Sequence, residues 1–173
     1  MHQYVYWTHL EDKKFNFYLA ATEEGLCFVG SLNQSIGELM EWTQKRLPNH
    51  QLIKGDEKLQ PYVCELREYL NGERQTFNFK TDLYGTSFQL VVWDKLKQIP
   101  YGKTYSYSDI AIMVEKPKAA RAVGTAIGAN PILITVPCHR VMGKNGALTG
   151  YRGGLDMKRL LLTIENSECQ YFS

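Results

Sequence analysis

The 173-residue sequence lacks the features that mark secreted, metal-binding and membrane proteins. Its four cysteines, Cys27, Cys64, Cys138 and Cys169, are widely spaced without a CxxC pair, which argues against a disulfide framework and against a cysteine-rich zinc site. No basic and apolar leader opens the chain, and no apolar run approaches the length that spans a bilayer. Phosphate-cradling glycine loops and dinucleotide fingerprints are absent as well. We therefore expect a cytoplasmic protein with no metal, no cofactor and no membrane association.

Composition and charge are ordinary overall but uneven along the chain. Hydrophobic residues make up 44% and charged residues 22%, enough for a core in one compact unit or two small ones. Residues 1–85 carry nine Lys/Arg against twelve Asp/Glu, a charge of −3, whereas residues 86–173 carry eleven against six, a charge of +5. The surplus would attract a negatively charged ligand such as nucleic acid to the second half, although it equally suits a solvated surface.

Residues 1–80 are predicted to form a small α+β domain. Three segments rich in aromatic and branched residues are expected to be consecutive strands. They are Tyr4–Thr8, Phe15–Ala21 and Leu26–Gly30.

Helices are expected to follow these strands. Ser35 is a suitable N-cap for a helix that ends at Leu47, and Asn71-Gly72 ends a second helix over Leu59–Leu70. The polar segment Asn49–Lys58 between the helices indicates a loop. Gln75–Phe79 alternates like a further strand, which would close the domain before a linker at residues 80–85.

Residues 86–173 are predicted to form a second, mainly helical domain. Thr86 and Gln89 match a capping box, in which each side chain satisfies a backbone N–H of the other residue. The helix that begins there is expected to reach Ile99 and to bury Trp93. The whole chain is therefore assigned to the α+β class.

A helix-turn-helix is predicted between residues 104 and 130. Ser106 and Asp109 cap a short first helix, and Pro117 suits the first position of a second helix over Pro117–Gly128. Small side chains in that second helix allow its backbone to approach a groove closely, and Arg121 offers a phosphate or base contact. A tightly packed helix pair without a ligand explains the same small residues.

The strongest chemical signal is a cysteine beside a histidine. The apolar run Ile132–Val136 indicates a short buried strand. Pro137 would end this strand and leave Cys138 accessible just beyond its end. An imidazole that accepts the thiol proton would activate the sulfur as a nucleophile, and His139 is its neighbour. Alone, the dipeptide also fits a buried structural cysteine beside a packed histidine.

The surrounding motifs resemble one family, the O6-alkylguanine-DNA alkyltransferases. The resemblance covers about residues 85–165 and consists of many short elements in the right order and spacing. These elements are Gly85-Thr86-Ser87-Phe88, Val92-Trp93, Tyr105-Ser106-Tyr107, Ala119-Ala120-Arg121-Ala122-Val123-Gly124, Asn130-Pro131, Pro137-Cys138-His139-Arg140-Val141, Gly146, Gly150-Tyr151-Arg152-Gly153-Gly154-Leu155 and Lys158.

The resemblance implies a DNA-repair reaction. Members of the family rotate a damaged nucleotide out of double-stranded DNA. They then move the alkyl group from O6 of guanine, and we expect also from O4 of thymine, to their own cysteine in one irreversible step. The resemblance further implies a ribonuclease H-like domain at residues 1–80 and a DNA-binding alkyltransferase domain at 86–173. No cofactor is required, and we expect a monomer.

The resemblance also implies a role for each matching residue. Cys138 would be the acceptor, activated through His139 and a water by Glu165, with Asn130 bracing the turn and Tyr107 donating a proton to the leaving guanine. The implied DNA contacts are Arg121, which fills the vacated space, Tyr107, Thr86, Ala120, Ala122 and Gly124. The implied base-pocket residues are Val141, Tyr151 and Arg152. Arg152 departs from the small residue that the family more often has, and it would narrow the pocket or bind a phosphate.

Two other functions fit parts of the sequence. A non-enzymatic lesion-binding protein of the same fold is one, but such relatives do not have cysteine at the position of Cys138. A cysteine hydrolase using Cys138 and His139 is the other, and it leaves the helix-turn-helix and Arg121 unexplained.

Overall fold

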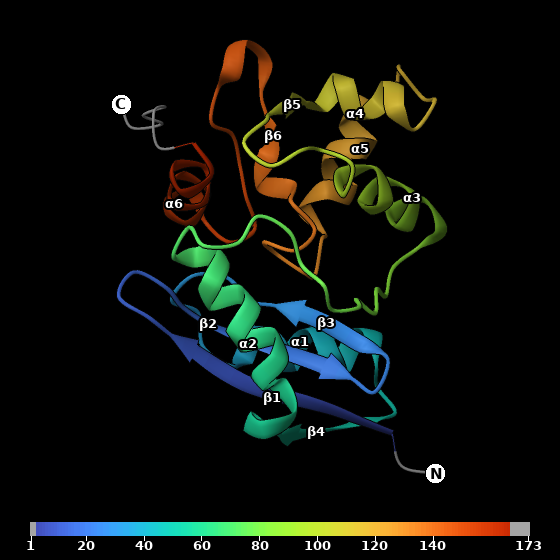
Figure 1. The fold of residues 1–173 in the computed structure, drawn as a ribbon. Helices are drawn as coiled ribbons and strands as arrows, with labels where there is room; N and C mark the ends of the chain where they lie inside the picture. Colours follow the sequence, from blue (N-terminus) through green and yellow to red (C-terminus); the bar gives the residue numbers. More distant parts are fainter. Residues whose placement is uncertain (1–2, 167–173) are drawn as a thin grey trace. The chain divides into compact units, whose positions relative to one another are not determined.

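The computed structural model describes residues 3–166 and divides into two compact units, one up to Tyr84 and one from Gly85 onward (Figure 1). A sheet with two helices forms the first unit, and helices dominate the second. The predicted α+β class is therefore confirmed. Among residues 3–166, no helix is long and apolar enough to cross a membrane.

The first unit is built on a four-stranded sheet in the order β3-β2-β1-β4. The three predicted strands are present, and the second pairs antiparallel with both the first and the third. A fourth strand lies parallel to β1. Their bounds are Gln3–Glu11 for β1, Asn16–Thr22 for β2, Gly25–Val29 for β3 and His50–Lys54 for β4.

Helix α1 covers Gly37–Arg46, and helix α2 covers Asp56–Leu70. The N-cap of α1 is Ile36 rather than the predicted Ser35, whose hydroxyl still accepts a hydrogen bond from the Gly37 N–H at 3.2 Å. As predicted, α2 ends at Asn71-Gly72, and Gly72 has a φ of 77°. Glycine adopts that left-handed conformation without a Cβ clash.

Successive residues of β1 point to opposite faces of the sheet, and both faces are buried. Val5 belongs to a core with Ala20 of β2 and Leu39 of α1. Leu10 is also completely buried but has the opposite alternation, and α2 contacts β1. The sheet of the first unit therefore has a helix for each face.

Two predictions for this unit were wrong. The expected loop at residues 49–58 contains β4 and the start of α2, because an edge strand paired on one side tolerates polar residues that hide its pattern. The expected strand Gln75–Phe79 is irregular. Its alternating aromatics pack instead on α2, with ring centroids 5.5 Å apart for Phe77 and Tyr69.

The second unit holds four α-helices, two very short strands and two 3-10 turns within its described part, residues 85–166. Helices α3, α4 and α5 contact one another, and α6 contacts the first 3-10 turn, η1. The helices are α3 at Ser87–Leu96, α4 at Tyr107–Met113, α5 at Ala120–Gly128 and α6 at Leu155–Glu165. The strands are β5 at Tyr105–Ser106 and β6 at Val141–Met142, and the 3-10 turns are η1 at Cys138–Arg140 and η2 at Lys144–Gly146.

Both predicted capping boxes are confirmed: Thr86 with Gln89 opens α3, and Ser106 with Asp109 opens α4. Trp93 is completely buried, and its ring N–H donates to the carbonyl of Ala126 in α5 at 2.8 Å. This bond joins the first helix of the unit to the second helix of the helix-turn-helix.

In the second unit, the helix bounds differ from the prediction at two places. Helix α5 begins at Ala120 and not at Pro117, which lies in the turn between the helices. Glu115, in that turn, has a φ of 62°. The reversal of the chain therefore takes up residues that the prediction placed in the first turn of the helix. Helix α3 stops at Leu96, and Ile99 is buried in the turn that follows.

Candidate functional site

The chain before Cys138 is a series of turns, so the predicted strand at Ile132–Val136 was wrong. Ile134 has a φ of 71°, a conformation that branched residues rarely adopt, and its side chain is buried. Packing of the side chains therefore fixes this segment against the preference of its backbone. Cys138 begins η1 directly after Pro137, and it is only 3% exposed rather than standing free at a strand end.

Asn130, which is completely buried, organises these turns through its side-chain amide. Its Nδ2 donates to the carbonyl of Val136 at 2.9 Å and to Sγ of Cys138 at 3.1 Å. Its Oδ1 accepts from the N–H of Ile132 at 3.0 Å. One side chain thus holds the turns at both ends and contacts the sulfur.

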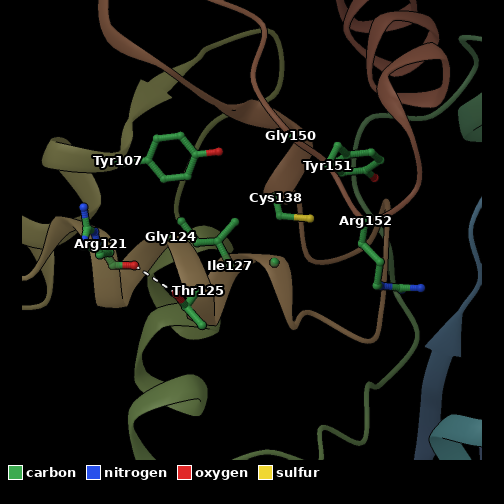
Figure 2. A pocket seen from close by; sticks show the side chains of 10 residues that line it. Tyr107, Arg121, Gly124, Thr125, Ile127, Cys138, Gly150, Tyr151 and Arg152 are labelled. Atoms are coloured by element: carbon green, nitrogen blue, oxygen red, sulfur yellow. Dashed lines mark hydrogen bonds between the residues drawn. The ribbon is translucent and has the colours of Figure 1, made fainter.

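Cys138 borders a cavity of about 390 Å³. Figure 2 shows Tyr107 and Arg121 on one side of the sulfur and Tyr151 and Arg152 on the other. The complete lining is Tyr107, Arg121, Gly124, Thr125, Ile127, Gly128, Cys138, Gly150, Tyr151 and Arg152. The structure therefore brings six of the predicted site residues around one space.

A two-residue ladder that the sequence did not predict joins the two sides. Tyr105 pairs with Val141 and Ser106 with Met142, in parallel, which ties the start of α4 to the chain just after η1. Tyr107 is the first residue of α4, and its hydroxyl lies 3.2 Å from Oγ1 of Thr149. The predicted pocket residue Val141 is completely buried in this ladder.

Glu165, at the end of α6, binds both His139 and Arg140. Its Oε2 lies 2.6 Å from Nε2 of His139, and Arg140 donates to both carboxylate oxygens at 2.8 and 2.9 Å. Arg140 also donates to the carbonyl of Ile99 at 2.7 Å. Sequence reasoning gave Arg140 no role, and its place beside Cys138-His139 in the motif was the available signal.

The charges in this group reinforce one another. Burial alone would raise the pKa of Glu165, but the hydrogen bonds of His139 and Arg140 and the guanidinium charge of Arg140 hold it well below its usual range. Burial lowers the pKa of His139, which favours a neutral imidazole. Because the carboxylate only accepts, the neutral ring must donate from Nε2, and its Nδ1 then carries the lone pair that can take a proton.

Two cations act on the sulfur. Burial raises the pKa of the Cys138 thiol, while the Asn130 hydrogen bond and the charges of Arg152 and Lys158 oppose that rise. Lys158 is 1% exposed and donates to the carbonyls of Val141 at 2.7 Å and Thr149 at 3.0 Å. No role for Lys158 could be predicted, because a buried lysine cannot be distinguished from a surface lysine by its sequence pattern.

Neighbouring groups complete the environment of the sulfur. Burial and the nearby Cys138 raise the pKa of Tyr151 well above its ordinary value, so its phenol stays protonated. Cys27, Cys64 and Cys138 are free thiols, and Cys169 lies outside the described residues. Within residues 3–166, no three His, Cys, Asp or Glu side chains are grouped as ligands for a metal ion.

A second hollow, of about 640 Å³, lies between the start of α3 and helix α5. We call it the α3–α5 groove, and its lining is Thr86, Phe88, Gln89, Lys118, Ala119, Arg121, Ala122, Thr125 and Ala126. Arg121 borders both the groove and the cavity. Of the predicted DNA contacts, Ala120 lines neither hollow and is half-buried as the first residue of α5.

Sequence models of one family match both units. The 6-O-methylguanine DNA methyltransferase DNA binding domain matches residues 87–167, and the ribonuclease-like domain of the same family matches residues 5–83. A methylated-DNA–protein-cysteine methyltransferase of Bacillus subtilis, described as inducible, is 58% identical over 161 residues, which are 93% of this chain and 90% of the relative. One from Methanosarcina acetivorans is 44% identical over 149 residues, 86% of this chain and 90% of the relative.

Solved structures agree with these matches. The crystal structure of Mycobacterium tuberculosis OGT in complex with DNA superposes with a TM-score of 0.80 at 36% identity, and the match covers 96% of each chain. The crystal structure of Mycobacterium tuberculosis O6-methylguanine methyltransferase gives a TM-score of 0.79 at 38% identity, covering 97% of this chain and 96% of that one. The chain belongs to the 6-O-methylguanine DNA methyltransferase family.

Proposed function

We propose that this protein repairs DNA by moving the alkyl group of O6-alkylguanine, and of O4-methylthymine, to the sulfur of its own Cys138. The observation that carries this proposal is the position of that sulfur. It borders the cavity of about 390 Å³ and accepts a hydrogen bond from Asn130. Relatives at 58% and 44% identity are named methylated-DNA–protein-cysteine methyltransferases, which supports the same reaction here.

The transfer is a single displacement. The thiol proton of Cys138 leaves through a water to Nδ1 of His139, and the thiolate attacks the alkyl carbon. The new bond is carbon–sulfur, the broken bond is carbon–O6, and the electron pair stays on the base. A proton from the Tyr107 hydroxyl converts the guanine anion to guanine, and Tyr107 recovers its proton from imidazolium through solvent. The thioether persists, so each molecule acts once and needs no cofactor.

Glu165 and Arg140 prepare the imidazole for this step. The carboxylate fixes His139 from Nε2 at 2.6 Å and offsets the positive charge that appears on the ring. Arg140 keeps Glu165 ionised, since it donates to both carboxylate oxygens. The lowered pKa of His139 also keeps the base free of a proton before the reaction begins.

DNA is the partner, and the second unit carries the contacts. Arg121 is exposed on α5 between the two hollows, where it could take the space that a flipped nucleotide leaves. Thr86 and Ala122 line the α3–α5 groove, Gly124 lines the cavity, and Ala120 begins α5. Small side chains here let the helix approach a minor groove without reading its sequence.

The base itself would sit in the cavity against the backbone of Cys138, Val141 and Arg152, with Tyr151 as a further pocket residue. Cys138, Tyr151 and Arg152 line the cavity, and Val141 lies in the adjoining ladder. Tyr107 would support the flipped ring from the opposite side. We further propose that the protein works as a monomer in the cytoplasm, where its described free thiols would stay reduced.

Mass spectrometry of the intact protein tests the proposal. The protein is mixed with an excess of duplex oligonucleotide containing one O6-methylguanine, with the same duplex containing guanine as the control. We expect the mass of one methyl group to be added once, on the peptide that contains Cys138. Tight binding of the damaged duplex without any added mass would make the protein a lesion sensor and overturn the proposed transfer.

A further inference from the structure

We propose that Arg152 is a positioning residue for the transfer step: its guanidinium fastens the turn at Asn130-Pro131, and thereby sets the Asn130 amide against the Cys138 sulfur. The inference rests on the proposed function, because the position of that sulfur matters only if it is the acceptor. It also assigns the Arg152 side chain a task that neither a narrowed pocket nor a phosphate contact describes.

The contacts of Arg152 converge on one turn. Its Nε donates to the carbonyl of Asn130 at 2.9 Å, and its Nη2 donates to the carbonyl of Pro131 at 3.1 Å. The side chain of the same Asn130 donates to Cys138 at 3.1 Å. Arg152 therefore holds the backbone of the residue whose side chain holds the sulfur.

The backbone that carries the Arg152 side chain is held in a fixed position. A Cβ added to Gly153 would come within 2.5 Å of Sδ of Met157 and 2.6 Å of the Tyr151 ring, so the chain there is tightly enclosed. Gly154 follows with a φ of 96° and precedes α6. Figure 2 shows the Arg152 side chain leading away from Tyr107 and Arg121. The enclosed backbone at Arg152 and the direction of its side chain therefore favour contact with the Asn130-Pro131 turn over contact at the outer rim of the cavity.

Only arginine suits this task among the basic residues. Its planar group presents several N–H donors in a rigid fork, which can satisfy two neighbouring carbonyls at once. A lysine would keep the charge but not the fork, and a small residue would keep neither. The positive charge adds a second effect, since it opposes the rise that burial causes in the pKa of Cys138.

Three variants separate these effects: Arg152→Ala, Arg152→Lys and, as the matched control, Arg159→Ala. Arg159 lies on α6 and pairs with Asp156 at 3.3 Å, outside the cavity lining. Single-turnover methyl transfer from O6-methylguanine duplex gives the rate. The pH profile of iodoacetamide modification, followed on the Cys138 peptide, gives the thiolate midpoint without requiring transfer. Binding of undamaged duplex at several salt concentrations gives affinity and salt slope.

We expect Arg152→Ala to slow transfer by about 10- to 100-fold, the effect of a small misplacement of reacting groups. The thiolate midpoint should move to higher pH, with duplex affinity and salt slope unchanged. Arg152→Lys should keep the midpoint near that of the unmodified protein but leave the rate reduced, and Arg159→Ala should behave as the unmodified protein.

Other outcomes overturn the inference. If Arg152→Ala transfers methyl at the original rate with its midpoint unmoved, the proposed repair reaction stands and the role of Arg152 is wrong. A salt slope lowered by about one unit would make Arg152 a phosphate contact instead. Absence of transfer by the unmodified protein would defeat the proposed function and, with it, the role of Arg152 in the transfer step. The iodoacetamide profiles would then show only whether Arg152 affects the Cys138 thiol.

Discussion

The two units each bury a cysteine, but the surroundings of the two sulfurs are opposite. Cys27 is completely buried in the sheet unit, where it donates to the carbonyl of Ala20 at 3.4 Å. Burial and then the charge of Asp82 raise its pKa. Cys138 is nearly as buried, yet an amide and two cations oppose the effect of burial. Burial alone therefore does not make a cysteine inert. The hydrogen bonds and charges around the sulfur determine its reactivity.

The same contrast holds for all buried polar residues in the described part of the chain. In the sheet unit they are neutral hydroxyls, namely Thr8, Ser31 and Thr43. In the helical unit they are an amide and four ionisable groups, namely Asn130, His139, Arg140, Lys158 and Glu165. Buried charge is costly unless it is paired, so its concentration in one unit marks that unit as the functional one.

The sharpest test of the contrast exchanges each cysteine for alanine. We expect Cys138→Ala to abolish methyl transfer while damaged duplex still binds, because only the acceptor atom is removed. Cys27→Ala should transfer at the original rate and lose about 1 kcal/mol of unfolding free energy. Transfer is measured by intact mass, binding by fluorescence anisotropy and stability in urea. Loss of DNA binding in Cys138→Ala would contradict the separation of chemistry from recognition.

The next effect concerns buried and exposed ion pairs. Glu165→Gln leaves His139 and Arg140 without their shared carboxylate, and we expect unfolding free energy to fall by about 3 kcal/mol. Transfer should slow by at least about 100-fold, the typical contribution of a positioned proton acceptor. Glu68→Gln removes an ion-pair partner of Arg74. Because the Glu68 side chain is 43% exposed, we expect the unfolding free energy to fall by only about 0–1 kcal/mol. Equal losses in urea would contradict the contrast.

Acid should remove the stability that the ionised Glu165 carboxylate gives to the folded protein. Its pKa is depressed in the folded protein and about 4.3 when unfolded, so the unfolded state binds the proton first as pH falls. The stability from the carboxylate is fully present above about pH 5 and is lost as pH falls through the depressed folded value. The difference in unfolding free energy between the original protein and Glu165→Gln should shrink from pH 7 to pH 3. A difference that stays constant over this range would refute the depressed pKa.

The smallest effect compares two serines at helix starts. Ser106 caps α4 by accepting from the Asp109 N–H at 3.0 Å, and Ser106→Ala should cost about 1 kcal/mol. We also expect slower transfer, since Tyr107 follows directly. Ser35→Ala removes only an exposed contact with Gly37 before α1, so a loss of a few tenths of a kcal/mol is expected. Thermal unfolding and single-turnover rates check both, and a larger loss for Ser35→Ala would reverse the assignment.

Features that depend on neighbouring residues could be predicted from the sequence. The capping boxes at Thr86 and Ser106 and the stop at Asn71-Gly72 are local chemistry, and the structure has all three. Periodicity failed at Ile132–Val136, because a short apolar run that is buried on all sides has the same composition in a turn as in a strand.

Contacts between distant residues could not be predicted from periodicity or local chemistry. Arg140 meets Glu165 only because α6 returns to η1, and Lys158 is buried only because its ammonium reaches Val141 and Thr149. The roles given to the site residues by resemblance stay predictions. The structure adds that six of these residues line one cavity.

Arg121 has a consequence that follows from thermodynamic linkage. Because one side chain borders both the α3–α5 groove and the cavity, a molecule that displaced Arg121 in one hollow would change the surroundings of the other. Any such coupling must be reciprocal, so a duplex in the groove changes the affinity of the cavity for a free alkylated base by the same factor that the base changes the affinity for the duplex. Measuring either factor would therefore fix both.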